Sequence, residues 1–415
     1  MQKEALQVLK TSEDTILLSP TGSGKTLAFL LPIIESLDPE SKEIQVLIIV
    51  PSRELALQIE QVVREMGSGY KANAIYGGRA GSKDKIDLQH PPAILIGTPG
   101  RIADHIERES FAVKSIKTLV LDEFDKSLEI GFEAEMKAII WELPQIRRKI
   151  LTSATEPKKI PAFVGLRDPF FINYLHEGNK KLSIKVVKSA KKDKLETLVE
   201  LINQIGNQPS IVFCNFKDSI DRVSEFLNSM NIPHGSFYGG LEQNDRERAL
   251  IKFRNGTYHL LLATDLAARG IDVPEIKFII HYHLPIKAEE FTHRNGRTAR
   301  MHQSGTAYVL QSPDEQLPDF IPSDYISLQE IEKGEDGSQK FETLFISGGR
   351  KDKISKGDIA GLFMKEGKLT KEELGIIELK QDCAFVAVKS DKANNLVSKL
   401  NNTHLKKRKI RIKVL

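Results

Sequence analysis

The chain has 415 residues, of which 40% are hydrophobic and 28% are charged. This composition is typical of a soluble globular protein, and the length predicts two to three domains. The longest apolar runs, such as residues 27–31, are too short to span a bilayer, which excludes a membrane-spanning protein. Met1 is not followed by a secretory leader, and Cys214 and Cys383 have no metal-ligand spacing, so we expect a cytoplasmic protein.

The net charge of +4 is unevenly distributed along the chain. Residues 341–415 carry 17 Lys and Arg against 9 Asp and Glu, so this segment holds all of the excess positive charge. A segregated basic segment indicates a polyanionic partner. A lysine-rich solvated surface has the same composition, and charge alone does not separate these two interpretations.

An apolar strand at 15–18, a glycine-rich loop and a helical run at 27–31 follow one another, which is the order of a phosphate-binding loop. Gly22 and Gly24 allow several backbone N–H groups to converge on one anion, and the following helix adds its positive dipole end. Lys25 is placed to reach the β- and γ-phosphates. The predicted nucleotide-binding residues here are Ser19, which stands where the generic pattern has Gly, and Pro20, Thr21, Gly22, Ser23, Gly24, Lys25 and Thr26.

Continuous apolar runs predict a parallel sheet that is buried on both faces. They include residues 46–50, 93–96, 118–121 and 149–152. Asp122 and Glu123 follow one of these strands, where an open α/β sheet places its ligands. In a chain with a phosphate loop, this pair predicts that Thr26 and Asp122 hold Mg²⁺ and that Glu123 orients and deprotonates the attacking water. On its own, such a pair is more often a solvated loop or a helix cap.

Nine short motifs occur in a fixed order along the chain. They are Pro-Ser-Arg-Glu-Leu-Ala at 51–56, Tyr-Gly-Gly-Arg at 76–79, Thr-Pro-Gly-Arg at 98–101, Asp-Glu-Phe-Asp at 122–125, Ser-Ala-Thr at 153–155, Ile-Val-Phe-Cys-Asn at 211–215, Gln-Asn-Asp-Arg at 243–246, Thr-Asp-Leu-Ala-Ala-Arg-Gly-Ile-Asp at 264–272 and His-Arg-Asn-Gly-Arg-Thr-Ala-Arg at 293–300. With these motifs the chain resembles DEAD-box ATP-dependent RNA helicases over residues 2 to about 311. The resemblance implies an α/β fold with two tandem RecA-like (P-loop NTPase) domains and an RNA-stimulated ATPase activity.

The second half of the helicase-like region repeats the α/β alternation. Its predicted strands include residues 209–214 and 258–263, and its predicted helices include residues 195–204 and 218–230. The sequence has no second phosphate loop, so the two domains must share one nucleotide. The resemblance implies RecA-like domains at 1–180 and 181–333 that face each other across a cleft, joined by a Lys-rich linker near 174–190.

The resemblance also assigns roles in ATP hydrolysis. Lys25, Asp122 and Glu123 match catalytic residues of the first domain. Arg297 and Arg300 match arginine fingers of the second domain, so hydrolysis would require the cleft to close. The other matched positions are Asp265 at the ribose, His293 on the γ-phosphate side, and Asp125, Ser153 and Thr155 in the element that couples the acidic site to closure.

RNA would lie across both domains, on a face separate from the ATP cleft. The positions that match contacts to the sugar–phosphate backbone are Arg53, Gly78, Thr98 and Arg101 in the first domain and Arg246 and Thr264 in the second. Such contacts position a strand without reading its sequence. The resemblance implies that closure bends one strand of a short duplex and releases its partner, which is local melting without long-range translocation.

Two positions depart from the family's pattern. Phe124 replaces the Ala of Asp-Glu-Ala-Asp, which places a bulky ring near the γ-phosphate and the motif at 153–155. The carboxylates of Asp122, Glu123 and Asp125 are kept, so we expect ATPase activity to be retained.

Gln2 matches the family's adenine-reading Gln, and we expect it to hydrogen-bond the adenine. No aromatic residue precedes Gln2 in the sequence to pack on the base. A shortened chain and a weakened adenine recognition are the two explanations.

Residues 341–415 change to the strand–helix–strand–strand–helix–strand order of a small α+β RRM-like domain. The predicted strands are 344–347, 374–379, 383–388 and 409–414, and the predicted helices are 356–365 and 392–400. The aromatic platform of RRMs is poorly kept, because Cys383 takes one stacking position and Phe385 the other. The basic residues are Arg350, Lys351, Lys353, Lys406, Lys407, Arg408, Lys409, Arg411 and Lys413.

The turn at 348–351 and the Lys-rich end of this domain resemble the RNA-binding tail of DbpA-type DEAD-box proteins. The predicted RNA contacts there are Arg350, Lys351, Lys407 and Arg408. That subgroup binds a hairpin of 23S ribosomal RNA and acts in large-subunit assembly. The resemblance therefore implies 23S rRNA in pre-50S particles as the partner of a monomer that uses ATP and Mg²⁺.

The leading hypothesis is an ATP-dependent RNA helicase that locally unwinds short duplexes and is targeted to structured RNA by its C-terminal domain. One alternative is a non-hydrolysing ATP-dependent RNA clamp, in which Phe124 and the short amino terminus leave binding without turnover. A DNA helicase is another alternative, and the motifs at 51–56 and 293–300 argue against it.

Overall fold

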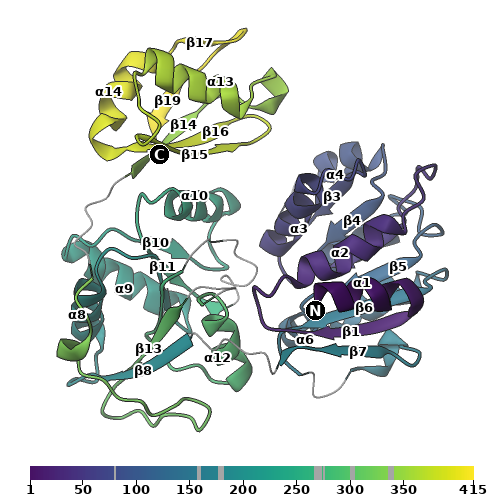
Figure 1. Cartoon of the computed structure of the whole chain (residues 1–415), viewed down its shortest axis with the longest axis horizontal. Coiled ribbons are helices and arrows are strands. Elements are labelled where there is room, and N and C mark those ends of the chain that lie inside the picture. The colour runs from purple at the N-terminus through teal and green to yellow at the C-terminus, as the bar shows by residue number, and fades with distance from the viewer. Residues whose placement is uncertain are drawn as a thin grey trace. The chain divides into compact units, whose positions relative to one another are not determined.

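The computed structural model describes residues 1–78, 81–156, 160–175, 182–265, 273, 276–299, 304–334 and 341–415. The chain forms two compact units, the first built mainly on Met1–Lys181 and the second mainly on the residues from Leu182 onward. Figure 1 shows the helices and strands of each unit. Among the described helices, none is both long enough and apolar enough to cross a membrane.

The first unit is built on a seven-stranded parallel sheet with the order β3-β4-β2-β5-β6-β1-β7. Its strands are β1 (Asp14–Leu18), β2 (Val46–Ile49), β3 (Ala72–Ile75), β4 (Ile94–Gly97), β5 (Thr118–Leu121), β6 (Arg148–Ser153) and β7 (Phe170–Asn173). Its helices are α1 (Gln2–Thr11), α2 (Lys25–Glu35), α3 (Arg53–Glu65), α4 (Gly81–Leu88), α5 (Pro99–Glu107), α6 (Phe124–Ile130) and α7 (Glu133–Trp141), with a 3₁₀ turn at Ala162–Val164.

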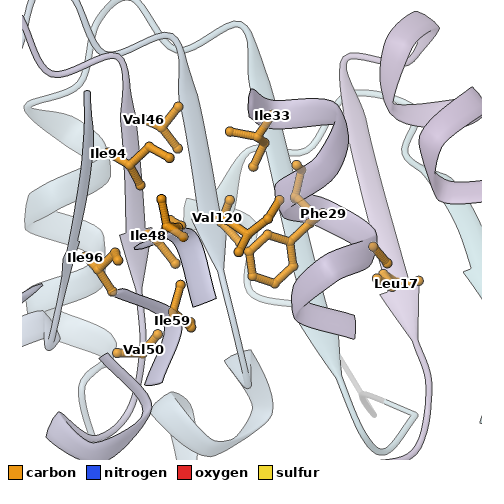
Figure 2. Packing of buried hydrophobic residues seen from close by; sticks show 14 of the residues in the cluster. Leu17, Phe29, Ile33, Val46, Ile48, Val50, Ile59, Ile94, Ile96 and Val120 are labelled. Atoms are coloured by element: carbon orange, nitrogen blue, oxygen red, sulfur yellow. The ribbon is translucent and has the colours of Figure 1, made fainter. Parts of the chain in front are cut away.

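Alternate residues of the strands supply two separate hydrophobic cores. Val46 and Ile48 of β2 point to one face, where they join Phe29 of α2 in one cluster (Figure 2). Leu47 and Ile49 of the same strand point to the other face and belong to the cluster that contains residues of α5, α6 and α7. Because both faces are buried, the strands read as continuous apolar runs, and the predicted parallel sheet is confirmed.

The second unit contains a six-stranded parallel sheet with the order β10-β11-β9-β12-β13-β8. The strands are β8 (Leu182–Lys188), β9 (Ser210–Phe213), β10 (Gly235–Phe237), β11 (Leu260–Ala263), β12 (Phe278–His281) and β13 (Gly305–Gln311). The helices are α8 (Leu195–Ile205), α9 (Lys217–Ser229), α10 (Gln243–Arg254) and α12 (Ala288–Asn295), with a 3₁₀ turn at Leu328–Glu330. The linker predicted near 174–190 is wrong in its second half, because β8 pairs with β13 along residues 182–188.

The same unit carries a four-stranded antiparallel sheet with the order β15-β16-β14-β19. Its elements are β14 (Phe341–Ile346), the 3₁₀ turn Arg350–Asp352, α13 (Lys356–Gly361) with a π-helical turn at Leu362–Glu366, β15 (Leu374–Leu379), β16 (Ala384–Lys389), α14 (Ser390–Leu400), β17 (His404–Leu405), β18 (Arg408–Lys409) and β19 (Ile412–Val414). This order confirms the predicted RRM-like domain.

The strand predicted at 409–414 is interrupted. β18 pairs with β17 in a short hairpin, whereas β19 pairs with β14. Ile410 lies between them, fully buried, and its N–H donates to the carbonyl of Thr403. The alternating pattern at 409–414 therefore belongs to two short strands.

The C-terminal sheet contacts α10 and the loop after it. Thr343 of β14 is fully buried, and its Oγ1 lies 3.1 Å from Asn255 Nδ2 and 2.8 Å from Thr257 Oγ1. Arg254 makes two hydrogen bonds of 2.8 Å to the Glu378 carboxylate. Leu344 packs into the core beneath α13 and α14, so Thr343 belongs to the opposite sheet face. Part of the face that RRMs normally leave open is covered here.

Candidate nucleotide site and RNA-binding surfaces

The phosphate loop joins β1 to α2, and its backbone requires glycine. Gly22 and Gly24 have φ values of 78° and 89°, in the left-handed region that residues with a Cβ rarely adopt. Ser19 Oγ donates to Ser23 Oγ across the loop at 2.7 Å. Lys25 Nζ turns back to donate to the carbonyls of Ser19 and Pro20 at 2.5 and 3.0 Å. The lysine cation is therefore held at the loop itself, where a phosphate would bind.

Gln2, at the start of α1, lies directly against this loop. Its Nε2 donates to the carbonyl of Gly24 at 3.4 Å, and a Cβ built on Gly24 would lie 2.4 Å from the same nitrogen. The positive φ therefore favours glycine at this position, and a Cβ there would displace the amide of Gln2 from the loop. The first helix is anchored by Ala5 and Leu9, both buried in the core. The predicted hydrogen bond from Gln2 to adenine stays a prediction.

The order of strands in the sheet brings the phosphate loop and the motifs at 122–125 and 153–155 together at the carboxyl ends of β1, β5 and β6. β6 lies between β5 and β1, with Leu121 opposite Leu151 and Leu18 opposite Ser153. The carboxyl ends of parallel strands meet at the same edge. The residues after β5, the end of β6 and the phosphate loop after β1 are consequently neighbours, and the N–H of Ser19 donates to the carbonyl of Ser153 at 3.1 Å.

The two carboxylates after β5 are buried. Asp122 and Glu123 are 3% and 7% exposed. Burial and the nearby Glu123 charge raise the pKa of Asp122 to about 6, partly opposed by a hydrogen bond from Thr152 and by the Lys25 charge. Burial lowers the pKa of Lys25 from its usual value. Opposite charges are thus concentrated in a site of low dielectric, where their interactions are strong.

The donor set at this edge fits a hard divalent cation. Asp122 supplies a buried carboxylate, and Thr26, the second residue of α2, supplies a hydroxyl. Oxygen ligands of this kind are those that Mg²⁺ prefers. The raised pKa of Asp122 means that its negative charge is incompletely compensated by protein groups, so a cation would stabilise the ionised form.

The coupling residues are in contact with one another. Thr155 Oγ1 donates to Asp125 Oδ2 at 2.8 Å, and the N–H of Thr155 donates to Ser153 Oγ at 3.0 Å. A direct link therefore joins α6, which begins after the acidic pair, to the segment after β6. The ring of Phe124, which the sequence places near the motif at 153–155, does not disrupt this contact.

Phe124 does not face this contact. The side chain is 2% exposed and belongs to the cluster beneath the sheet that includes Leu121 and Met136. Burial in the core accounts for a large apolar residue at this position. The main sequence feature in favour of a non-hydrolysing clamp thereby loses its physical basis.

Four predicted RNA contacts lie after β2, β3 and β4, which are neighbours in the sheet. Arg53 begins α3, and a Cβ on Gly78 would lie 2.9 Å from Arg53 Nη1, so these two residues are adjacent. Thr98 is the N-cap of α5, and Arg101 lies in its first turn. The four residues are thus gathered at one edge of the first unit.

A buried carboxylate that the sequence did not indicate holds Arg101. Asp84 is fully buried, and its Oδ2 accepts a hydrogen bond from Arg101 Nε at 2.8 Å and forms an ion pair with Arg101 Nη2 at 2.7 Å. The same carboxylate oxygen lies 3.1 Å from His105 Nε2, and Arg101 also pairs with Asp104 at 3.2 Å. No local motif marks Asp84, because its partners come from another helix.

Asp265, at the end of the second unit's β11, is engaged by a buried arginine. Arg294 is 1% exposed and donates to both Asp265 oxygens at 2.7 and 2.5 Å, and to Asn215 Oδ1 at 2.7 Å. The sequence prediction missed this role, although Arg294 lies within the motif at 293–300. The arrangement joins three of the motifs in one network.

The remaining predicted residues of this half of the helicase-like region lie in or beside the helices and strands that surround the second parallel sheet. Arg246 of α10 is buried, and its guanidinium carbon lies 4.8 Å above the centre of the Phe237 ring. Thr264 follows β11, His293 is buried in α12, and Arg297 follows α12. Arg300 and most of the motif at 264–272 fall outside the described residues.

The basic residues of the C-terminal domain fall into two groups. Arg408 donates to the carbonyl of Ser347 and to Asp352 Oδ1 at 3.0 and 2.5 Å, and Lys406 pairs with Asp358 at 2.7 Å. These two side chains hold the β17–β18 hairpin to the turn at Arg350–Asp352 and to α13. By contrast, several exposed cations form no ion pair with a carboxylate within the part of the chain that the structure describes; they include Arg350, Lys351 and Lys407, and also Lys353, Lys409, Arg411 and Lys413.

The expected stacking platform is only partly available. Phe385 is 6% exposed and packs edge-on against Phe345, with ring centres 5.7 Å apart. Lys413 Nζ lies 5.6 Å from the centre of the Phe345 ring. The exposed cations are therefore stronger candidates for contacting RNA than Phe345 and Phe385 of the sheet.

Family comparisons agree with these three regions. The DEAD/DEAH box helicase family matches residues 1–163, the helicase conserved C-terminal domain matches residues 193–302, and the DbpA RNA binding domain matches residues 343–414. The chain is 31% identical to the ATP-dependent RNA helicase DbpA of Escherichia coli, over 100% of this chain and 94% of that protein. It is 29% identical to DbpA of Bacillus subtilis, over 99% of this chain and 93% of that protein.

Solved structures show the same fold. One is S. cerevisiae Dbp5 bound to RNA and ADP BeF3, with a TM-score of 0.70 and 26% identity over 79% of this chain and 90% of that one. Another is Mss116p bound to ssRNA and AMP-PNP, with a TM-score of 0.67 and 27% identity over 74% of this chain and 68% of that one. The chain therefore belongs to the DbpA-type DEAD-box ATP-dependent RNA helicases, a family of RNA-stimulated ATPases with an RNA-binding C-terminal domain.

Proposed function

We propose that this helicase locally unwinds short duplexes in 23S rRNA during assembly of the large ribosomal subunit, acting as a cytoplasmic monomer on pre-50S particles. The observation that carries the proposal is the exposed cation group Arg350, Lys351 and Lys407 in a domain of the DbpA RNA-binding type. Full-length similarity to DbpA of two bacteria supports it. Exposed cations that form no ion pair within the protein are available for contacts with phosphate groups.

In the proposed chemistry, backbone N–H groups of residues 19–26 bind the phosphates, and Lys25 leaves its loop carbonyls for the β- and γ-oxygens. Asp122 and Thr26 would hold Mg²⁺, and a bound Mg²⁺ would neutralise charge on the phosphates. Glu123 orients the attacking water and accepts its proton. The buried setting favours this chemistry, because charges act strongly where water is excluded.

Residues from the second half of the sequence would complete the site. We assign Arg297 and Arg300 to the γ-phosphate as arginine fingers, Asp265 to the ribose and His293 to the γ-phosphate side. Closure would place Arg246 and Thr264 on the same RNA strand as the residues predicted to contact RNA in the first unit. The Thr155–Asp125 hydrogen bond supports a link between the acidic site and closure, because it joins the segments that follow β5 and β6.

The RNA target is tested by crosslinking the chain to cellular RNA and mapping the sites. We expect enrichment of large-subunit rRNA over other transcripts. Reversing the charge of Arg350, Lys351 and Lys407 to Glu should abolish the enrichment, whereas Lys399→Glu, an exposed lysine on α14, should leave it intact. A wild-type chain without enrichment for large-subunit rRNA would overturn this target.

A further inference from the structure

One buried hydroxyl contacts both members of the acidic pair. Thr152 is the fifth residue of β6, and its side chain is fully buried. Its Oγ1 donates to Asp122 Oδ1 and accepts from the N–H of Glu123 at 3.3 Å. A hydroxyl has one proton to donate and lone pairs to accept, so both of its capacities are used.

These contacts constrain the pair in two ways. Asp122 Oδ1 also accepts from the N–H of Glu123 at 3.1 Å, whereas Oδ2 accepts no hydrogen bond from the described residues. Glu123 has φ 47° and ψ 49°, a left-handed conformation that costs free energy in any residue with a Cβ. The hydroxyl of Thr152 thus accepts from the N–H at the strained position and fixes which carboxylate oxygen remains for a ligand.

We propose that Thr152 is a positioning residue of the ATPase site: it holds Asp122 so that Oδ2 serves the metal, and it holds the backbone turn that directs Glu123. This inference rests on the proposed roles of Asp122 and Glu123. Thr152 belongs to β6 and precedes the motif at 153–155, so the same strand end serves both the acidic pair and the coupling segment.

The test compares Thr152→Val, which keeps the shape and removes the hydroxyl, with Thr152→Ser, which keeps the hydroxyl. The control is Thr15→Val in β1, a fully buried threonine whose Oγ1 has no hydrogen-bond partner among the described residues. Thr152→Ala is a second hydroxyl-free variant should the valine variant not fold. Thermal melting establishes that each protein is folded.

The first readout is the Mg²⁺ concentration that half-saturates binding of a fluorescent ADP analogue, which needs no turnover. Thr152→Val should raise this concentration about tenfold, the usual effect of losing one hydrogen bond to a charged group. It should also lower kcat, with little change in Mg²⁺-free nucleotide binding. Thr152→Ser and Thr15→Val should stay within about twofold of the wild type.

Equal Mg²⁺ dependence and equal kcat in the wild type and the folded hydroxyl-free variant would overturn the role of Thr152. Glu123→Gln separates this from failure of the proposed chemistry. If Glu123→Gln abolishes turnover while Thr152→Val changes nothing, only the positioning role fails. If Glu123→Gln retains turnover, the proposed role of Glu123 fails first, and the directing role of Thr152 falls with it.

Discussion

At the scale of single residues, Asp122 illustrates how burial prepares a site for a cation. Its pKa in the fold is about 6, against an ordinary value of 3.8. Between these values the folded state binds the proton more tightly than the unfolded chain, so stability falls as the pH rises through this window. Above it the buried carboxylate is ionised and unfavourable until a cation binds.

Mg²⁺-dependent nucleotide binding should therefore depend on pH. Below pH 6 a proton competes with the cation for Asp122, so the apparent Mg²⁺ affinity should fall towards about tenfold per pH unit. A fluorescent-nucleotide titration between pH 5 and pH 8 measures this. Asp122→Asn is the control, because any pH dependence that remains in it belongs to the nucleotide. Identical pH profiles for the two proteins would contradict the assignment.

Phe124 should matter for stability more than for chemistry. Its ring is buried in a hydrophobic core, so Phe124→Ala should lower the free energy of unfolding by about 3 kcal/mol. Turnover per folded molecule should stay within a few-fold of the wild type. Denaturant unfolding measures the first, and ATPase assays below the melting temperature measure the second. A stable variant with abolished turnover would place the ring in the catalytic chemistry.

Sequence reasoning identified residues that share a motif and missed those that meet only in space. Asp122 and Glu123 are adjacent, and a strand followed by two carboxylates is recognisable. Thr152 and Asp84 contact their partners across the fold, and nothing local distinguishes them from other strand or helix residues. Phe124 stood out as a departure from a motif, but whether its ring faced the nucleotide or the core depended on packing.

At the scale of elements, the turn after β14 carries the exposed Arg350 and Lys351 and is held in place by close packing. A Cβ on Gly349 would lie 2.4 Å from the carbonyl oxygen of Gln381, closer than real contacts allow. The N–H of Lys351 donates to that same carbonyl at 2.9 Å. The position of the cations therefore depends on a glycine that has no contact with RNA in our account.

Gly349→Ala should displace this turn. We expect the C-terminal domain to lose about 2 kcal/mol of stability through overpacking and RNA affinity to fall. Gly361→Ala is the matched control, because a Cβ at this helical position meets nothing within 4 Å. Thermal unfolding measures the stability of both variants, and RNA titration measures their RNA affinity. Unchanged RNA affinity in a folded Gly349→Ala protein would show that the turn does not position the cations.

Whether a segment forms a strand or a helix could be predicted where a single pattern of apolar residues dominated its sequence. The apolar run at 118–121 is β5, and the helix predicted at 195–204 is α8 with one further residue. The strand predicted at 409–414 was wrong because alternation does not reveal that the chain changes partner at Ile410. Which strands pair with one another is a tertiary property, and the alternation of apolar and polar residues along one segment does not specify it.

At the scale of the whole molecule, one phosphate loop serves a chain with two parallel-sheet regions. The residues to which we assign nucleotide chemistry come from both halves of the sequence, with Lys25, Asp122 and Glu123 in the first half and Arg297 and Arg300 in the second. Under the proposed assignment, turnover would require closure of the two halves, and RNA bound to both halves would favour closure. The order of the motifs predicted two α/β domains, and the two parallel sheets confirm this part of the prediction.

The central claim is that the buried acidic pair hydrolyses ATP when RNA is bound. ATP turnover of the wild type and of Glu123→Gln should be measured with and without large-subunit rRNA. RNA should raise wild-type turnover by at least about tenfold, while Glu123→Gln binds nucleotide but does not turn it over. Wild-type turnover no higher than that of Glu123→Gln in the presence of RNA would contradict the account and leave a non-hydrolysing RNA clamp.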